Sequence, residues 1–101
     1  MGVLTLDNCT IKISGHLDFS NVPRLWNESL PLLAKIPEVH FDFTDVIDSN
    51  SAGLSLLLEW VKLCKSQNKK ISFENIPAQV LSIARVSGVD KILHLNVIRP
   101  F

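Results

Sequence analysis

The polar stretch at residues 44–53 contains the side chains with the best prospects of chemistry. Ser49 and Ser51 lie there between a predicted strand and a predicted helix, where ligand and partner contacts gather in open α/β sheets. The Ser51 hydroxyl could simply cap the helix by accepting a backbone N–H, a contribution of about 1 kcal/mol. In a second interpretation this helix end is a recognition point, because a phosphate on Ser51 would lie at the positive helix terminus and change the charge that a docked partner meets. The spacing alone favours the cap.

Sequence signatures of metal sites, nucleotide sites and catalysis are absent. His16, His40 and His94 lie in separate predicted elements, without the spacing of zinc motifs. With four glycines in all, the chain has neither a Gly-rich phosphate loop nor a nucleophile elbow. A Cys–His nucleophile pair stays open, because such partners need only meet in space. We therefore expect no catalytic residues, no metal, no cofactor and no small-molecule substrate.

Length and composition predict one globular domain that binds another protein. The 101 residues suffice for one core and predict a single domain over residues 1–101. Ten Lys and Arg residues balance ten Asp and Glu residues, so the chain lacks the positive charge with which proteins bind nucleic acid. The positive mean hydropathy predicts that some apolar surface stays exposed for a partner.

Cysteine usage and the first residues indicate a cytoplasmic protein. Cys9 and Cys64 are far apart and form no CxxC motif, so we expect both to be reduced and buried as small hydrophobic side chains. The first residues lack the basic and long apolar regions of a secretory signal peptide. No apolar run reaches the length of about 18 residues that spans a bilayer. Any membrane connection is therefore expected to pass through another protein.

The spacing of apolar residues predicts the elements that position Ser51. Alternating patterns predict strands, the first two joined as a hairpin, at residues 3–6, 11–15, 39–43 and 71–74. Helical patterns predict helices at residues 22–35, 54–67 and 77–85. Strands that alternate with helices indicate an α/β fold, in which a mixed sheet of four to five strands is covered by crossover helices.

Prolines, glycines and polar residues set the expected boundaries of these elements. Pro31 should bend or break the first helix, because proline removes a backbone hydrogen bond. The polar residues 44–53 are expected to form a loop, and Gly88 is expected to stop the last helix. Residues 89–95 are predicted to form a helical turn or a short strand.

The helix at residues 54–67 has a wider apolar surface than one core requires. Its apolar side chains cover an arc of roughly 220°, whereas a surface helix needs about 100°. Neighbouring helices of the same domain could cover the excess. Alternatively, one edge is a docking surface, either Leu56, Trp60 and Leu63 or the side of Leu54 and Leu58. Trp60 is then the expected anchor, because tryptophan is enriched at binding hot spots.

Residues 41–60 resemble the signature of the STAS domain. The resemblance rests on Phe41-Asp42-Phe43-Thr44-Asp45-Val46, on Asn50-Ser51-Ala52-Gly53-Leu54 and on Leu56-Leu57-Leu58-Glu59-Trp60. The A-G-L-x-L-L-L-E-W run and residues 71–89 are most similar to the small STAS subunit of Mla-type phospholipid ABC transporters. Anti-sigma-factor antagonists are also similar.

The resemblance implies a non-catalytic adaptor. Transporter subunits of this kind are cytoplasmic, are peripheral to the inner membrane through the transporter, and bind its ATPase subunit. The residues expected to bind the partner are Asn50, Ser51, Ala52, Gly53, Leu54, Leu56 and Trp60.

The alternative that the resemblance implies is an anti-sigma-factor antagonist, in which phosphorylation of Ser51 breaks a protein complex. Ser51 occupies the position that is phosphorylated in such members. Asn50 stands where the family usually has Asp, which makes a phosphorylation switch less expected. A third possibility, an enzyme with Ser51 as nucleophile, would need a base that no motif supplies.

Overall fold

The computed structural model describes residues 2–89 as a single α/β domain with four strands and three helices. In chain order the elements are β1 (Val3–Asp7), β2 (Thr10–Leu17), α1 (Val22–Lys35), β3 (Glu38–Ser49), α2 (Ser51–Ser66), β4 (Lys70–Glu74) and α3 (Ala78–Ser87). The sheet order is β1-β2-β3-β4, with β1 and β2 antiparallel and the other pairs parallel. The predicted mixed sheet is confirmed, with four strands in this part of the chain. The expected element at residues 89–95 lies almost entirely outside the described residues.

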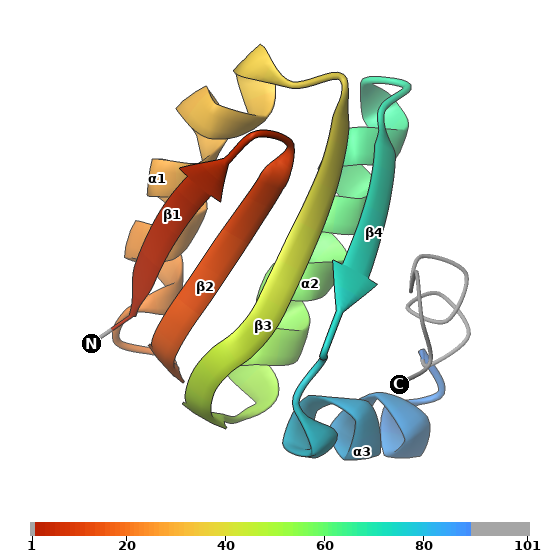
Figure 1. Cartoon of the computed structure of the whole chain (residues 1–101). Helices are drawn as coiled ribbons and strands as arrows, with labels where there is room; N and C mark the ends of the chain where they lie inside the picture. The colour runs from red at the N-terminus through yellow and green to blue at the C-terminus, as the bar shows by residue number, and fades with distance from the viewer. Residues whose placement is uncertain (1, 90–101) are drawn as a thin grey trace.

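The helices cover the sheet unevenly. Figure 1 shows α1 and α2 packed side by side on one face, while the other face is open. The third helix, α3, lies at the end of the sheet where β4 ends and α2 begins. This end therefore gathers the first turns of both covering helices and the carboxyl ends of the parallel strands.

The third strand is longer than the sequence predicts. Residues 44–49, expected as part of a loop, continue β3 and pair with β2 up to the match of Leu17 with Ser49. Two register shifts interrupt this pairing, so the side chains of the extension lose the two-residue alternation that reveals a strand. Backbone pairing needs no particular side chain, and the polar side chains of Thr44, Asp45 and Asp48 are exposed to solvent.

The helices differ from the prediction at the start of α2 and at Pro31, and agree with it elsewhere in the bounds of α1 and at Gly88. The first helix has the predicted bounds and runs unbroken through Pro31. Pro31 and Asn27, four residues before it, are both exposed, so water can satisfy the carbonyl that loses its partner. The second helix begins at Ser51, three residues earlier than predicted. Gly88 ends α3 in the left-handed conformation (φ 76°), as predicted.

The hydrophobic core lies between the sheet and the two covering helices. Trp60 of α2 stacks on Phe41 of β3 with ring centroids 4.0 Å apart. Its indole Nε1–H donates to the Ser29 hydroxyl of α1 at 2.9 Å. This bond satisfies the one polar group of the ring and joins the two helices inside the core.

The two cysteines differ in burial. Both are free, Cys64 is buried, and Cys9 is exposed in the turn between β1 and β2. The prediction of burial is therefore wrong for Cys9, because a hairpin turn lies on the surface. Burial raises the pKa of the Cys64 thiol above its usual value.

Candidate functional site

Ser51 lies at the end of the molecule where β2 and β3 finish and both covering helices begin. Its side chain is exposed. The backbone N–H of Asn50 donates to the Leu17 carbonyl of β2 at 3.2 Å, which fixes the first turn of α2 against the strand ends. The predicted place of Ser51, at a strand end and a helix start, is confirmed.

Asn50 caps the helix, in place of Ser51. Asn50 has an extended backbone (φ −130°, ψ −162°), and its side-chain oxygen accepts the Ala52 N–H at 2.8 Å. Ser51 is already the first helical residue, so its hydroxyl cannot take the cap geometry. Within the described chain the Ser51 hydroxyl forms no hydrogen bond, and only its carbonyl accepts one, from Ser55. The side chain is therefore free to contact a partner.

The residues after Ser51 position the helix and are not exposed. Ala52, Gly53, Leu54 and Leu56 are all buried. A Cβ at position 53 would lie 2.2 Å from the Ser49 hydroxyl oxygen and 3.3 Å from the Leu17 Cβ. Glycine therefore lets α2 begin close to the ends of β2 and β3 without displacing the Ser49 hydroxyl. These residues therefore lie in the interior, beneath the exposed Ser51 side chain.

Trp60 lies in the core, so its expected exposure as an anchor is wrong. The side chain is 0% exposed and is stacked and hydrogen-bonded as described above. The wide apolar arc of α2 is covered by the sheet, by α1 and by α3 (Figure 1), which was the alternative to a docking edge. The exposed residues of α2 are Ser51, Ser55, Glu59, Lys62, Lys65 and Ser66.

Phe19 and Ile47 are exposed apolar side chains next to the ends of β2 and β3, and the sequence reasoning missed both; Val86 of α3, at the same end of the molecule, is also exposed. Phe19, in the connection from β2 to α1, is 70% exposed, and Ile47, near the end of β3, is 73% exposed. A phenylalanine beside polar turn residues is the signal that could have identified the first. Phe19, Ile47, Ser51 and Ser55 are called the Ser51 surface below.

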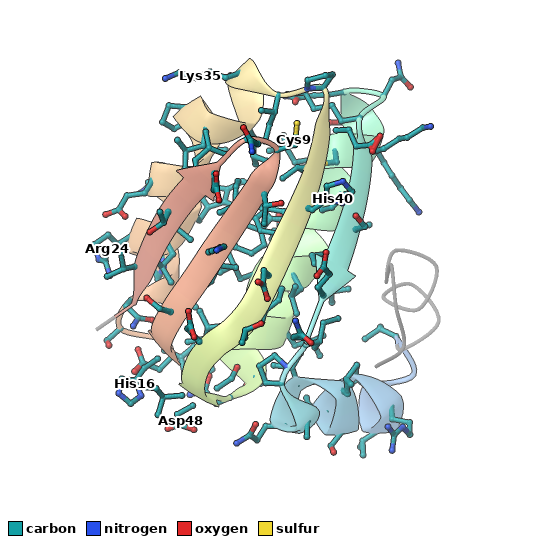
Figure 2. All side chains as sticks on the ribbon, viewed as in Figure 1. Cys9, His16, Arg24, Lys35, His40 and Asp48 are labelled. Atoms are coloured by element: carbon teal, nitrogen blue, oxygen red, sulfur yellow. The ribbon has the colours of Figure 1, made fainter. Side chains whose placement is uncertain are left out.

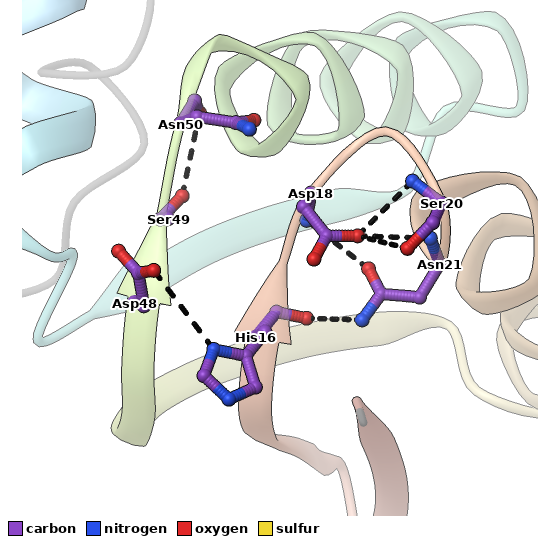
Figure 3. Close-up of polar contacts among 7 residues, drawn as sticks. All are labelled: His16, Asp18, Ser20, Asn21, Asp48, Ser49 and Asn50. Atoms are coloured by element: carbon purple, nitrogen blue, oxygen red, sulfur yellow. Dashed lines mark hydrogen bonds and ion pairs between the residues drawn. The ribbon is translucent and has the colours of Figure 1, made fainter.

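Polar contacts hold the connection that carries Phe19. Figure 3 shows the Asp18 carboxylate accepting from the Ser20 N–H, from the Ser20 hydroxyl at 2.6 Å and from the Asn21 N–H. The Asn21 side chain in turn donates to the His16 carbonyl at 2.6 Å. The bond from the Ser20 hydroxyl is the main cause that lowers the pKa of Asp18 below its usual value. The connection is thus shaped while Phe19 stays exposed.

An open hollow lies between the first turns of the covering helices. Its volume is about 270 Å³. The lining residues are Val22, Pro23, Trp26, Ser55, Leu56 and Glu59. Ser55 also belongs to the Ser51 surface, so the hollow, called the α1–α2 hollow below, continues that surface.

The two ends of the molecule differ in charge. Asp18, Asp45 and Asp48 lie at or near the Ser51 end, where the His16 Nδ1 is 3.9 Å from an Asp48 carboxylate oxygen (Figure 3). Figure 2 shows Lys35 at the opposite end from His16 and Asp48. A second hollow at that opposite end, of about 350 Å³, is lined by Glu38, Lys65, Lys69, Lys70, Ile71 and Ser72. The strand ends around Ser51 thus carry mainly carboxylates, while α3 at the same end contributes the exposed Arg85.

A row of Ser, His and Glu lies on the open face of the sheet. His40 Nδ1 is hydrogen-bonded to the Ser72 hydroxyl of the paired strand, and His40 Nε2 lies 3.6 Å from a Glu38 carboxylate oxygen. Such a row matches the order of a hydrolase triad, but it lies on the open face of the sheet near the start of β3, at the opposite end of that strand from Ser51. As a cross-strand pair it stabilises the sheet. Within residues 2–89 no histidine is hydrogen-bonded to a cysteine thiol.

Comparisons with known proteins identify the same kind of domain. The family model described as "Mlab, STAS domain" matches residues 3–97. The anti-sigma factor antagonist SpoIIAA in its unphosphorylated form is 17% identical, with a TM-score of 0.69 over 90% of this chain and 84% of that one. An anti-sigma factor antagonist from Mycobacterium paratuberculosis is 20% identical, with a TM-score of 0.70 over 91% and 80%.

No curated protein matches the sequence significantly. None of the helices in residues 2–89 has the length and apolar character needed to cross a membrane. At these identities the likeness to the two antagonists concerns the fold alone.

Proposed function

The chain belongs to the Mlab-type STAS domain family, and from this premise we propose that it is a cytoplasmic binding subunit of a phospholipid ABC transporter. In this role the Ser51 surface docks on the ATPase subunit, and the chain reaches the membrane only through that complex. The observation that carries the proposal is the pair of exposed apolar side chains, Phe19 and Ile47, at the same end of the molecule as the exposed Ser51.

Exposed aromatic side chains are costly to leave in water and are enriched at binding hot spots. Phe19 lies two residues after Leu17, whose carbonyl accepts the Asn50 N–H. It therefore extends from the strand end that contacts the start of α2. A partner that covers this end buries Phe19 together with the exposed positions of α2.

The contribution of such a subunit is binding, and ATP hydrolysis belongs to the ATPase. A chain that binds only the folded ATPase stabilises that state by mass action. A negative charge introduced at Ser51 would lie three residues from Asp48 in the sequence. It would repel an acidic group of the partner or strengthen the attraction to a basic one. The Ser51 end thereby sets which partner surface is accepted.

An anti-sigma-factor antagonist is the second candidate function, and one observation favours it. The Ser51 hydroxyl is exposed and unbonded within the described chain, as a phosphate acceptor must be. However, the preceding residue is the neutral Asn50, whose side chain caps the helix. Incorporation of phosphate at Ser51 by a kinase encoded nearby, with loss of binding to an anti-sigma factor, would favour this candidate over the first.

The test replaces Phe19 with serine and measures binding to an ABC-transporter ATPase subunit of the same organism. We expect Phe19→Ser to weaken the complex at least about tenfold, equivalent to about 1.4 kcal/mol. Stability should change by less than about 0.5 kcal/mol, because the side chain is exposed. Titration calorimetry and denaturant unfolding give the two values.

Leu30→Ser is the matched control, since Leu30 is a partly exposed apolar residue in the second half of α1, away from Ser51. It should leave ATPase binding within about twofold of the native value. Failure of the native chain to bind the ATPase would refute the proposed function. Equal weakening by both substitutions would refute the Ser51 surface as the docking site.

A further inference from the structure

We propose that the α1–α2 hollow accepts one apolar side chain of the partner, and that a lysine or arginine next to this side chain pairs with Glu59. The identity of the partner as the ATPase rests on the function proposed above. The chemistry of the inserted group rests on the hollow itself.

The walls of the hollow are apolar and come from both helices. Val22, Pro23 and Trp26 line it from the first turns of α1, and Leu56 lines it from α2. Leu56 is buried, whereas Trp26 is only partly so. The volume is about 270 Å³, and a cavity of about 150 Å³ already accommodates a benzene ring in other proteins. One leucine, methionine or phenylalanine side chain would therefore fit in this space.

The rim of the hollow carries an uncompensated negative charge. Glu59 is exposed and, among residues 2–89, forms no ion pair. The arginine of α1, Arg24, is bound elsewhere, to the Glu28 carboxylate at 2.8 Å and to the Gly2 carbonyl. A cation brought by the partner therefore meets a free carboxylate beside an apolar wall, where partial desolvation strengthens the attraction.

The hollow is continuous with the surface that contains Ser51. Ser55 lies one helical turn after Ser51, and its hydroxyl donates to the Ser51 carbonyl at 3.2 Å. Val22 follows Phe19 by three residues. One partner segment that covers Phe19 can thus also reach the hollow, which argues for the same occupant at both.

A direct test uses a small probe and the two tryptophans. Acetyl-leucyl-lysine amide, at millimolar concentration, should shift the NMR signal of the Trp26 indole N–H, because Trp26 lines the hollow. The signal of Trp60 should stay unchanged, because Trp60 is buried in the core. Acetyl-leucyl-glutamate amide should shift the Trp26 signal less, because its carboxylate repels Glu59. No shift with the lysine probe, or equal shifts with both probes, would overturn the proposal.

A second test fills the hollow. Ser55→Trp should abolish the probe shift and weaken ATPase binding at least about tenfold. Ser66→Trp is the matched control, because Ser66 is an exposed serine of the same helix whose hydroxyl also donates to a backbone carbonyl, that of Leu63. Ser66→Trp should leave the probe-induced shift and the ATPase affinity within about twofold of the native values. Unfolding curves must show that both variants fold.

The outcomes separate this proposal from the proposed function. A probe shift with no ATPase binding by the native chain would keep the hollow and refute the ATPase as partner. If Phe19→Ser weakens ATPase binding and Ser55→Trp leaves it unchanged, the proposed function stands. The proposal that a partner side chain enters the hollow is then overturned. Self-association that Ser55→Trp abolishes would assign the hollow to a second copy of this chain and overturn the proposal as well.

Discussion

Trp60 and Phe19 are both large aromatic residues, but the first is buried in the core and the second is exposed to solvent. Trp60 is 0% exposed, stacks on Phe41 and donates a hydrogen bond to Ser29. Phe19 is 70% exposed in a connection that polar bonds to Asp18 hold in place. The difference shows that the place of an aromatic residue in the assembled fold, and not its residue type, decides whether it packs in the core or stays exposed.

The comparison also explains the wide apolar surface of α2. That helix contacts β4, α1 and α3 as well as covering the centre of the sheet. A helix enclosed on three sides needs a much wider apolar arc than one that lies alone on a sheet. The width of the arc therefore reports how many neighbours the helix has within the domain.

The largest expected effect comes from replacing Trp60. Trp60→Ala should destabilise the domain by about 3–5 kcal/mol, because it removes a stacked ring from the core and leaves a cavity. Denaturant unfolding measures the change, and Phe19→Ala should alter stability by less than about 0.5 kcal/mol in the same assay. A Trp60→Ala protein that is as stable as the native one but no longer binds the ATPase would reverse the roles assigned to the two aromatics.

An intermediate effect is expected at Gly53, which lies beneath the Ser51 surface. In Gly53→Ala the new Cβ meets the Ser49 hydroxyl oxygen at 2.2 Å, so either this buried hydroxyl must rotate away or the start of the helix must shift. We expect a net loss of about 1–2 kcal/mol, because overpacking outweighs the helix-forming advantage of alanine. Thermal or denaturant unfolding measures it.

A double-mutant cycle with Ser49 gives the control for this prediction. In a Ser49→Ala background the same Gly53→Ala change should cost less, since the hydroxyl oxygen is gone and only the Leu17 Cβ at 3.3 Å remains close. An equal cost in both backgrounds would show that the Ser49 hydroxyl is not the obstacle.

The smallest expected effect concerns Asp18, which shapes the connection around Phe19. Its pKa is lowered, mainly by the Ser20 hydroxyl, so its ionised form is favoured in the folded state. The resulting stability is fully present above the unfolded value near 3.8 and is lost as the pH falls through the lower folded value.

Urea unfolding of the native protein and of Asp18→Asn across this pH range tests the assignment. The native protein should be slightly the more stable at neutral pH, and the difference should shrink towards pH 2. A difference that is constant with pH would mean that ionisation of Asp18 does not contribute to holding the connection.

Much of the fold follows from the sequence, because its signals are local. The first helix is predicted with its observed bounds, and Gly88 ends α3 where its freedom to adopt a positive φ is needed. The extension of β3 through Asp48 could not be predicted, since it depends on pairing with β2 across two register shifts. Pro31 was expected to disturb α1 because the pattern did not reveal that its surroundings are solvated.

The candidate site was predicted only in part. The position of Ser51 follows from the change of pattern between strand and helix, but the cap at Asn50 depends on backbone angles that residue types do not fix. The burial of Trp60 depends on neighbours from other elements, among them Phe41 of β3 and Ser29 of α1. Phe19 was missed because exposure is a property of the assembled fold, and a single phenylalanine in a turn has no periodic pattern to mark it.

The narrow exposed side of α2 offers a small set of positions at which recognition can be altered by substitution. Roughly one side chain per turn, beginning with Ser51 and Ser55, can be exchanged without touching the packed interior. A combinatorial library confined to those few sites, on an otherwise fixed scaffold, would sample new recognition specificities while every member keeps the same folding information.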